Sequence, residues 1–151
     1  LGQEASAPKT KAESESLQKG ENDQEDATEE VIMRIAALDP DSILSLKELA
    51  GEDDPDFFIE LVEKYLETGE TLFAELAEAI RQNDSEKINA LGHQMKSNTA
   101  NFGAFELSEY CAWLEKTAKA GGVIPVESAE KLLEEFEAVK RALQVELDAV
   151  K

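Results

Sequence analysis

Apolar side chains recur every three or four positions along most of the chain from residue 28 onward. This spacing places them on one face of an α-helix, whereas a half-buried β-strand would show strict alternation. No part of the chain sustains such alternation. The pattern therefore predicts an all-α protein whose main amphipathic helices cover residues 55–81, 85–101, 104–120 and 126–151.

Aspartate and proline mark where predicted helices begin. Asp39-Pro40 and Asp54-Pro55 each combine an N-cap with proline at the first helical position, and Asp84 is placed to cap the next helix. The first pair predicts a short helix, and the apolar pattern predicts another short one just upstream. Short connections favour antiparallel neighbours. We expect an antiparallel up-and-down four-helix bundle with short N-terminal helices closing one end.

Residues 1–28 differ from the rest of the chain in composition. Apart from alanines, their apolar residues are Leu1 and Leu17, set among charged and small polar residues. Such a segment cannot bury enough apolar surface to offset the entropy lost on ordering. We therefore predict a disordered acidic and polar linker over residues 1–28 and a helical bundle over residues 29–151. An acidic recognition tail is the alternative interpretation of the first segment.

The chain is strongly acidic, with 34 Asp and Glu against 15 Lys and Arg and a formal net charge of -19. This balance argues against nucleic acid and anionic membranes as partners, because both are held by basic patches. No apolar run approaches the length of a membrane span. The single cysteine, Cys111, fits a reducing compartment, so we expect a cytoplasmic protein, with a monomer as the default. Because the sequence begins at Leu1 rather than methionine, we also expect it to be part of a longer protein.

His93 is the only histidine in the chain and lies within the predicted helix over residues 85–101. The apolar positions of that helix form one stripe, and His93 falls on the opposite, exposed side. Lys96 and Ser97 lie one turn ahead of it and Asn89 one turn behind. A lone surface histidine is usually inert. Here, however, mostly short side chains and a single cation surround the ring, which leaves it accessible to a large partner.

Several kinds of chemistry are excluded by what surrounds this histidine in the sequence. One imidazole without a thiol cluster does not make a zinc site. No glycine-rich phosphate loop of the G-x-x-x-x-G-K-[ST] type is present, so autonomous kinase activity is not expected. A neutral imidazole is nevertheless a good nucleophile toward an activated phosphoryl group, and Lys96 can supply a cation beside the incoming oxygens.

A longer motif surrounds and follows His93. It consists of His93-x-x-Lys96-Ser97, Asn101-Phe102-Gly103-Ala104, Leu107, Cys111 and Leu114-Glu115. In order and spacing this motif resembles the histidine-containing phosphotransfer (HPt) domain, and the resemblance covers about residues 40–120. The sequence departs from the family pattern at Gly92, where alanine is common, at Met95, where leucine is common, and at Ser97, where glycine is common. All three keep small size or apolar character.

The resemblance implies a phosphorelay intermediate of two-component signalling. His93 would accept a phosphoryl group from the phospho-aspartate of a response-regulator receiver domain and pass it to another receiver aspartate. Lys96 would stabilise the phosphoryl group, and Mg²⁺ would be carried by the partner receiver rather than by this chain. The partners would be receiver domains, with a hybrid sensor kinase in cis as a further one.

The same resemblance suggests roles for the neighbours of His93. Ser97 and Asn89 are predicted to contact the phosphoryl group. Gly92, Ala100 and Gly103 are predicted to leave room for the loops of a receiver, the alternative being that they serve helix packing alone.

Three other functions are compatible with parts of this pattern. The phosphate-accepting domain of a chemotaxis-type histidine kinase shares the His-x-x-Lys spacing, but its histidine is charged by an ATP-binding domain. An HPt-like docking module would use the same surface without phosphorylation. A histidine-dependent hydrolase is disfavoured, because no nucleophile and no oriented base accompany the ring.

Overall fold

The computed structural model describes residues 37–50 and 55–151. This part of the chain contains helices and no strand, so the predicted all-α class is confirmed. The predicted linker over residues 1–28 and most of the short helix predicted just before Asp39 lie outside the described residues. The helices are α3 (Pro40–Ala50), α4 (Pro55–Arg81), α5 (Ser85–Ala100), α6 (Phe105–Lys119) and α7 (Glu127–Val150).

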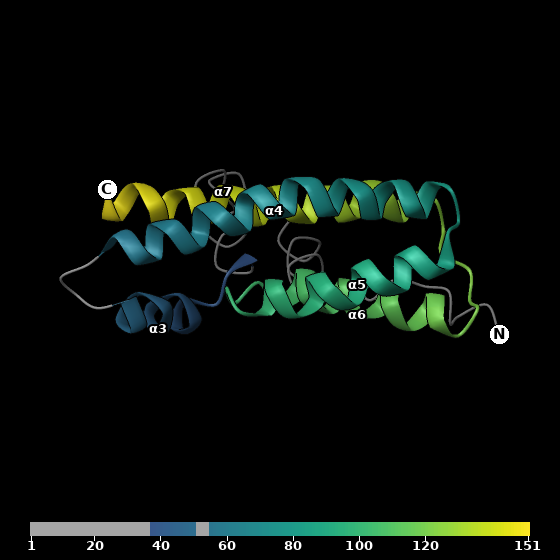
Figure 1. The fold of residues 1–151 in the computed structure, drawn as a ribbon, viewed down its shortest axis with the longest axis horizontal. Coiled ribbons are helices and arrows are strands. Elements are labelled where there is room, and N and C mark those ends of the chain that lie inside the picture. Colours follow the sequence, from purple (N-terminus) through teal and green to yellow (C-terminus); the bar gives the residue numbers. More distant parts are fainter. Residues whose placement is uncertain (1–36, 51–54) are drawn as a thin grey trace, which may run out of the picture.

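The four long helices lie along the long axis of the molecule, and successive ones run in opposite directions (Figure 1). α4 packs against both α5 and α7, α5 packs against α6, and α6 completes the circuit by contacting α7. The α5–α6 pair therefore forms one edge of the molecule, and the α4–α7 pair forms the opposite edge. α3 packs against α4.

Two of the predicted capping residues begin the helices that follow them, and the third, Asp54, lies outside the described residues. Asp39 accepts hydrogen bonds from the backbone N–H and the hydroxyl of Ser42, at 3.0 and 2.8 Å, and so caps α3. Asp84 accepts a hydrogen bond of 3.2 Å from the backbone N–H of Lys87 and caps α5. Both contacts satisfy N–H groups that have no partner within their own helix.

The turn between α5 and α6 holds the start of α3. Gly103 has φ of +74°, a conformation that glycine adopts without strain. Its carbonyl accepts a 2.8 Å hydrogen bond from the backbone N–H of Asp39. A Cβ at Gly103 would lie 2.7 Å from the Cβ of Ser42. The turn and the cap of α3 thus fit together because position 103 has no side chain.

Aromatic rings join α4, α7 and the turn between α5 and α6 in the core. Tyr65 on α4 lies 4.6 Å from the ring of Phe102 and 6.2 Å from that of Phe136, and Phe136 lies 4.7 Å from Phe73. Gly69 makes room for this group, because a Cβ there would come within 2.6 Å of Phe136. The predicted apolar seam of the last helix faces this core, with buried positions Leu132, Phe136, Val139, Leu143 and Leu147.

One buried polar pair lies among these apolar side chains. The hydroxyls of Tyr65 on α4 and Thr99 on α5 are 2.9 Å apart and hydrogen-bonded to each other. Burial raises the pKa of the Tyr65 hydroxyl, so the group stays protonated. The bond fixes α5 against α4 at the end of the helix that carries His93.

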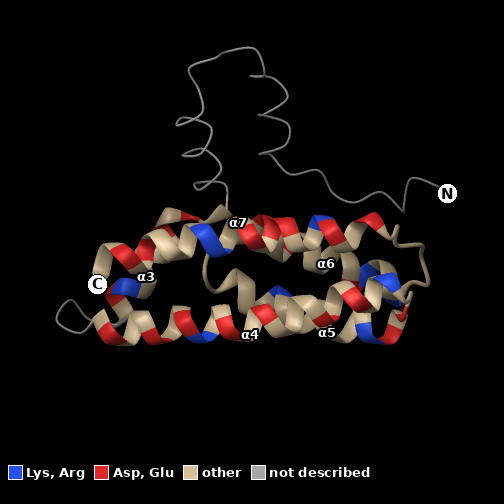
Figure 2. Cartoon of the chain, turned by 90° about the horizontal axis from the view of Figure 1, so that it is seen from above, with Lys and Arg blue, Asp and Glu red and all other residues tan. Residues whose placement is uncertain are grey.

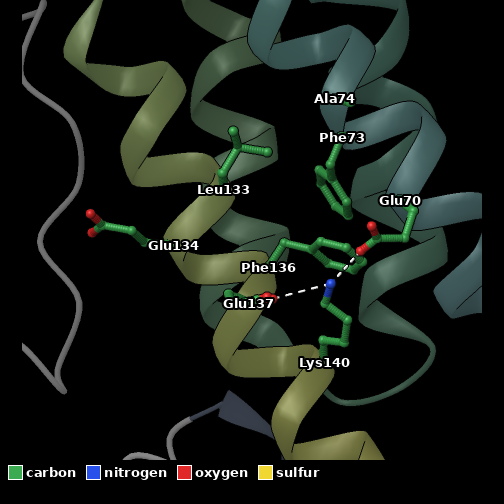
Figure 3. Close-up of a pocket in the computed structure, with 8 residues that line it drawn as sticks. All are labelled: Glu70, Phe73, Ala74, Leu133, Glu134, Phe136, Glu137 and Lys140. Carbon is green, nitrogen blue, oxygen red and sulfur yellow. Dashed lines mark hydrogen bonds and ion pairs between the residues drawn. The ribbon is translucent and has the colours of Figure 1, made fainter.

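On the opposite edge, a groove of about 390 Å³ lies between α4 and α7 (Figure 3). Phe73 and Phe136 line it, and Lys140 on α7 forms an ion pair across the groove with Glu70 on α4 and a second one with Glu137 on its own helix. The Lys140 ammonium lies 5.6 Å from the centre of the Phe136 ring. The ion pair with Glu70 raises the pKa of Lys140. Because Lys140 already bridges the groove, we interpret this side chain as one that stabilises the packing of α4 against α7.

We predict that Tyr65→Phe and Thr99→Val each destabilise the protein by about 1–3 kcal/mol, because each leaves one buried hydroxyl without its partner. The double variant should lose less than the sum of the two, since it removes both hydroxyls together. Urea unfolding of the four proteins measures this. Additive losses would show that the two hydroxyls do not depend on each other.

Candidate phosphoacceptor site

His93 projects from the outer face of α5, with 67% of its side chain exposed. The apolar stripe of the same helix, including Ile88 and Met95, is buried in the core. Helical periodicity accounts for both facts, because positions 88 and 95 lie on the side of the helix opposite to position 93. The predicted exposure of the imidazole is therefore confirmed.

A single carboxylate joins the two basic side chains of the site. Nδ1 of His93 lies 2.7 Å from one oxygen of Glu115, and the ammonium of Lys96 donates a 2.8 Å hydrogen bond to the other oxygen. Glu115 comes from α6, and its side chain is only 19% exposed. The site is thus assembled from both helices of the α5–α6 edge.

This arrangement determines which nitrogen of the ring carries a proton. The hydrogen bond from Lys96 lowers the pKa of Glu115, and the contact with His93 lowers it further, against the opposing effect of desolvation. An ionised carboxylate can only accept hydrogen bonds, so Nδ1 of His93 carries the hydrogen in the contact. In the neutral ring, Nε2 then holds the free lone pair. The chemistry available to the site is nucleophilic attack by Nε2.

Gly92 allows α5 and α6 to approach closely beside this network. A Cβ at Gly92 would lie 3.0 Å from the carbonyl oxygen of Cys111 and 3.2 Å from the backbone nitrogen of Glu115. Gly92 and Gly103 are both buried. Their missing side chains therefore make room for α6 and for α3, which favours the alternative of helix packing, and a role of Gly92, Ala100 and Gly103 in leaving room for a receiver stays a prediction.

The remaining predicted neighbours take different positions. Ser97 is exposed one turn from His93, and Ala100 is partly exposed near the end of α5. Asn89 faces α6, where its side-chain amide donates a 3.2 Å hydrogen bond to the carbonyl oxygen of Glu115. Contact of Ser97 or Asn89 with a phosphoryl group stays a prediction.

Sequence analysis missed the part that Glu115 plays. Glu115 appears there only as the last residue of the motif, 22 positions after His93. One available signal was the short turn at Asn101–Ala104, which brings the next helix back antiparallel to the first. Pairing positions across that turn places residues 111–115 opposite the stretch of α5 from Asn89 to His93.

Burial distinguishes two further side chains of α6. Cys111 is fully buried, and burial raises the pKa of its thiol to about 12, so it is a small core residue and not a nucleophile. Phe105, at the start of α6, is 47% exposed. Among the described residues, no group of three or more His, Cys, Asp or Glu is placed to hold a metal ion.

Comparison with known proteins identifies the family. Residues 60–150, more than half of the chain, match the family model of the Hpt domain, so the chain belongs to this family. The multistep phosphorelay regulator 1 of Schizosaccharomyces pombe (strain 972 / ATCC 24843) is 29% identical over 83 residues, which are 55% of this chain and 28% of that protein. The chain thus spans little more than a quarter of that relative. No solved structure matches the chain.

Membership of this family confirms the resemblance stated from the motif. Hpt domains are phosphotransfer modules of two-component phosphorelays, and they are neither kinases nor phosphatases. Within the described part of the chain, no helix has the length and apolar character needed to cross a bilayer.

We predict that Glu115 contributes to stability in a pH-dependent way. Its folded-state pKa is lowered, so its contribution is complete above the ordinary glutamate pKa of about 4.3 and is lost as the pH falls through the lowered value. Urea unfolding of the wild type and of Glu115→Gln at a series of pH values measures this, because the other acidic groups are common to both. The difference between the two proteins should shrink below about pH 4. A difference that stays constant with pH would contradict the assignment.

Proposed function

We propose that this Hpt domain is a phosphorelay intermediate in which His93 accepts a phosphoryl group from the phospho-aspartate of one receiver domain and passes it to the aspartate of another. The observation that carries the proposal is the exposed imidazole whose Nδ1 is held by Glu115, which leaves the lone pair of Nε2 available as the nucleophile. Helices α4 to α7 would form the antiparallel up-and-down four-helix bundle that presents it.

The chemical step follows from this geometry. The lone pair of Nε2 attacks phosphorus in line with the aspartyl oxygen, the P–O bond breaks, and the aspartate leaves as a carboxylate. The hydrogen stays on Nδ1 and in its bond to Glu115 throughout, so the phosphorylated ring carries one positive charge, which the carboxylate of Glu115 stabilises. Transfer to the second receiver is the same step in reverse, with a carboxylate as the nucleophile.

Lys96 has two tasks in this proposal. Before transfer its ammonium offsets the charge of Glu115, which would otherwise repel an incoming phosphoryl group. During transfer its long, 36% exposed side chain is free to turn toward the phosphoryl oxygens and stabilise their charge. Further positive charge, including Mg²⁺, would come from the receiver.

Two alternative functions use the same surface: charging of His93 by an ATP-binding domain, as in a chemotaxis-type kinase, and docking without phosphorylation. The relative that contains a similar segment is named as a phosphorelay regulator, which favours transfer between receivers over charging by an ATP-binding domain. We infer no autonomous kinase or phosphatase activity. A cytoplasmic location, a monomeric state and a hybrid kinase in cis stay predictions of the sequence.

We predict that the protein accepts label from a radiolabelled phospho-receiver in the presence of Mg²⁺, and that His93→Gln does not. A phosphoryl group on imidazole is labile to acid and stable to base, and this test identifies the bond. Because His93 is the only histidine, the variant has no second imidazole that could take the label.

The outcomes separate the three functions. Labelling by an ATP-binding kinase domain, with no transfer from any receiver, would support the chemotaxis-type alternative. Binding to receivers without labelling by any donor would support the docking module. Labelling of His93→Gln would show that another residue is the acceptor.

We further predict that Glu115→Ala lowers the rate of phosphoryl uptake by about 10- to 100-fold, because the ring loses the partner that fixes its tautomer and orientation. Glu115→Gln keeps an oxygen that can accept from Nδ1 and should lose less. Single-turnover transfer from one phospho-receiver measures both. Equal rates in the wild type and Glu115→Ala would remove Glu115 from the mechanism.

A further inference from the structure

Two hydrogen bonds from a side chain to a backbone carbonyl connect α5 and α6, one with its donor on α5 and the other with its donor on α6. The amide of Asn89 on α5 donates to the carbonyl oxygen of Glu115 at 3.2 Å, and the hydroxyl of Ser108 on α6 donates to the carbonyl oxygen of Lys96 at 2.8 Å. The two acceptors belong to Glu115 and Lys96, the residues whose side chains meet at the site. Each bond thus holds the backbone of one member of the network to the other helix.

The residues involved form matching stripes on the two helices. Asn89, Gly92 and Lys96 have the spacing of three and four residues that defines one face of α5. Ser108, Cys111 and Glu115 repeat the same spacing on α6. Because the helices run in opposite directions, the first residue of each stripe lies opposite the last residue of the other (Figure 1).

The close contact at Gly92 lies between the two bonds. The bonds join the ends of a stretch of eight residues on each helix, which is about 10 Å long. Apolar packing and the small size of Gly92 bring the helices together, but such contacts are not directional. Hydrogen bonds lose most of their strength when donor and acceptor move apart by an ångström or bend away. Two of them at separate points resist both sliding and splaying of the helix pair.

We propose that Asn89 and Ser108 are positioning residues that lock the register of α5 against α6, so that the Glu115 carboxylate reaches Nδ1 of His93 and the ammonium of Lys96 at once. The hydrogen bonds of both side chains go to backbone carbonyl groups of the opposite helix and not to the ring. A shift of α6 by a fraction of one helical turn would stretch the contacts of 2.7 and 2.8 Å that Glu115 makes. The effect on phosphoryl transfer rests on the proposed function, whereas the effect on the imidazole does not.

The first experiment is a tautomer measurement on the full chain. With ¹⁵N-labelled histidine, long-range ¹H–¹⁵N spectra report a single ring, because the chain has one histidine. In the wild type the spectrum should show hydrogen on Nδ1. Asn89→Ala and Ser108→Ala should each reduce this preference, and the double variant should reduce it most. Ser108→Thr keeps a hydroxyl and should restore it.

A matched control excludes a general effect of losing a polar side chain from α5. Asn98 lies on the same helix and is partly buried, like Asn89, but it does not contribute to the crossing bonds. Asn98→Ala should leave the tautomer unchanged. Circular dichroism and urea unfolding verify that every variant is folded under the conditions of the spectrum.

The second measurement tests coupling through Glu115. In the wild-type background, we expect the Asn89→Ala/Ser108→Ala pair to slow phosphoryl uptake from a phospho-receiver by about tenfold or more. In the Glu115→Ala background the same pair should cause no further loss, because the carboxylate that it positions is absent. A merely stabilising role would instead give similar losses in both backgrounds.

An unchanged tautomer in folded Asn89→Ala/Ser108→Ala would overturn the proposal. So would equal losses of rate in the presence and absence of Glu115. Failure of the proposed function gives a different result, because the wild type would then accept no phosphoryl group. The tautomer measurement would still show whether Asn89 and Ser108 fix the register of α5 against α6.

Discussion

The close approach of α5 and α6 at Gly92 is the constraint on which the site depends. Glu115 has a short reach, and its carboxylate contacts two side chains of the other helix only because the two backbones nearly touch. A side chain at position 92 would push against the backbone of α6, which is far less able to yield than the end of a flexible side chain. The chemistry of an exposed ring is therefore set by packing in a buried contact.

Local signals account for the parts that the sequence predicted correctly. Asp39 and Asp84 act within one turn of themselves, and the exposure of His93 follows from the period of its own helix. The contact of Glu115 with His93 depends instead on the rotation and register of two helices, which the period of either helix alone does not define. The same limit explains why the roles of Gly92 and Gly103 could not be predicted. The sequence shows that both residues are small, but only the packing of the helices shows which neighbouring segment needs the space.

In this acidic protein, single charged side chains link neighbouring helices. Figure 2 shows acidic residues spread along the helices, with fewer basic residues among them. One carboxylate contacts two basic side chains, and one ammonium contacts two carboxylates. Glu115 accepts from His93 and Lys96 on the α5–α6 edge, and Lys140 donates to Glu70 and Glu137 on the α4–α7 edge. Each arrangement crosses between neighbouring helices, so both edges are tied by shared charges in addition to the apolar core.

The exposure of His93 also bears on how a phosphoryl group would be kept. The ring stands on the outside of a continuous helix, and no described segment folds over it. A group attached at Nε2 would be surrounded by water and would be available to any protein that reached that face. Its lifetime would be governed by the strength of the nitrogen–phosphorus bond, and its destination by the shape of whichever partner arrives. Such a domain would work as an open carrier, and the proteins that donate and accept the phosphoryl group would determine when and to which partner it is passed.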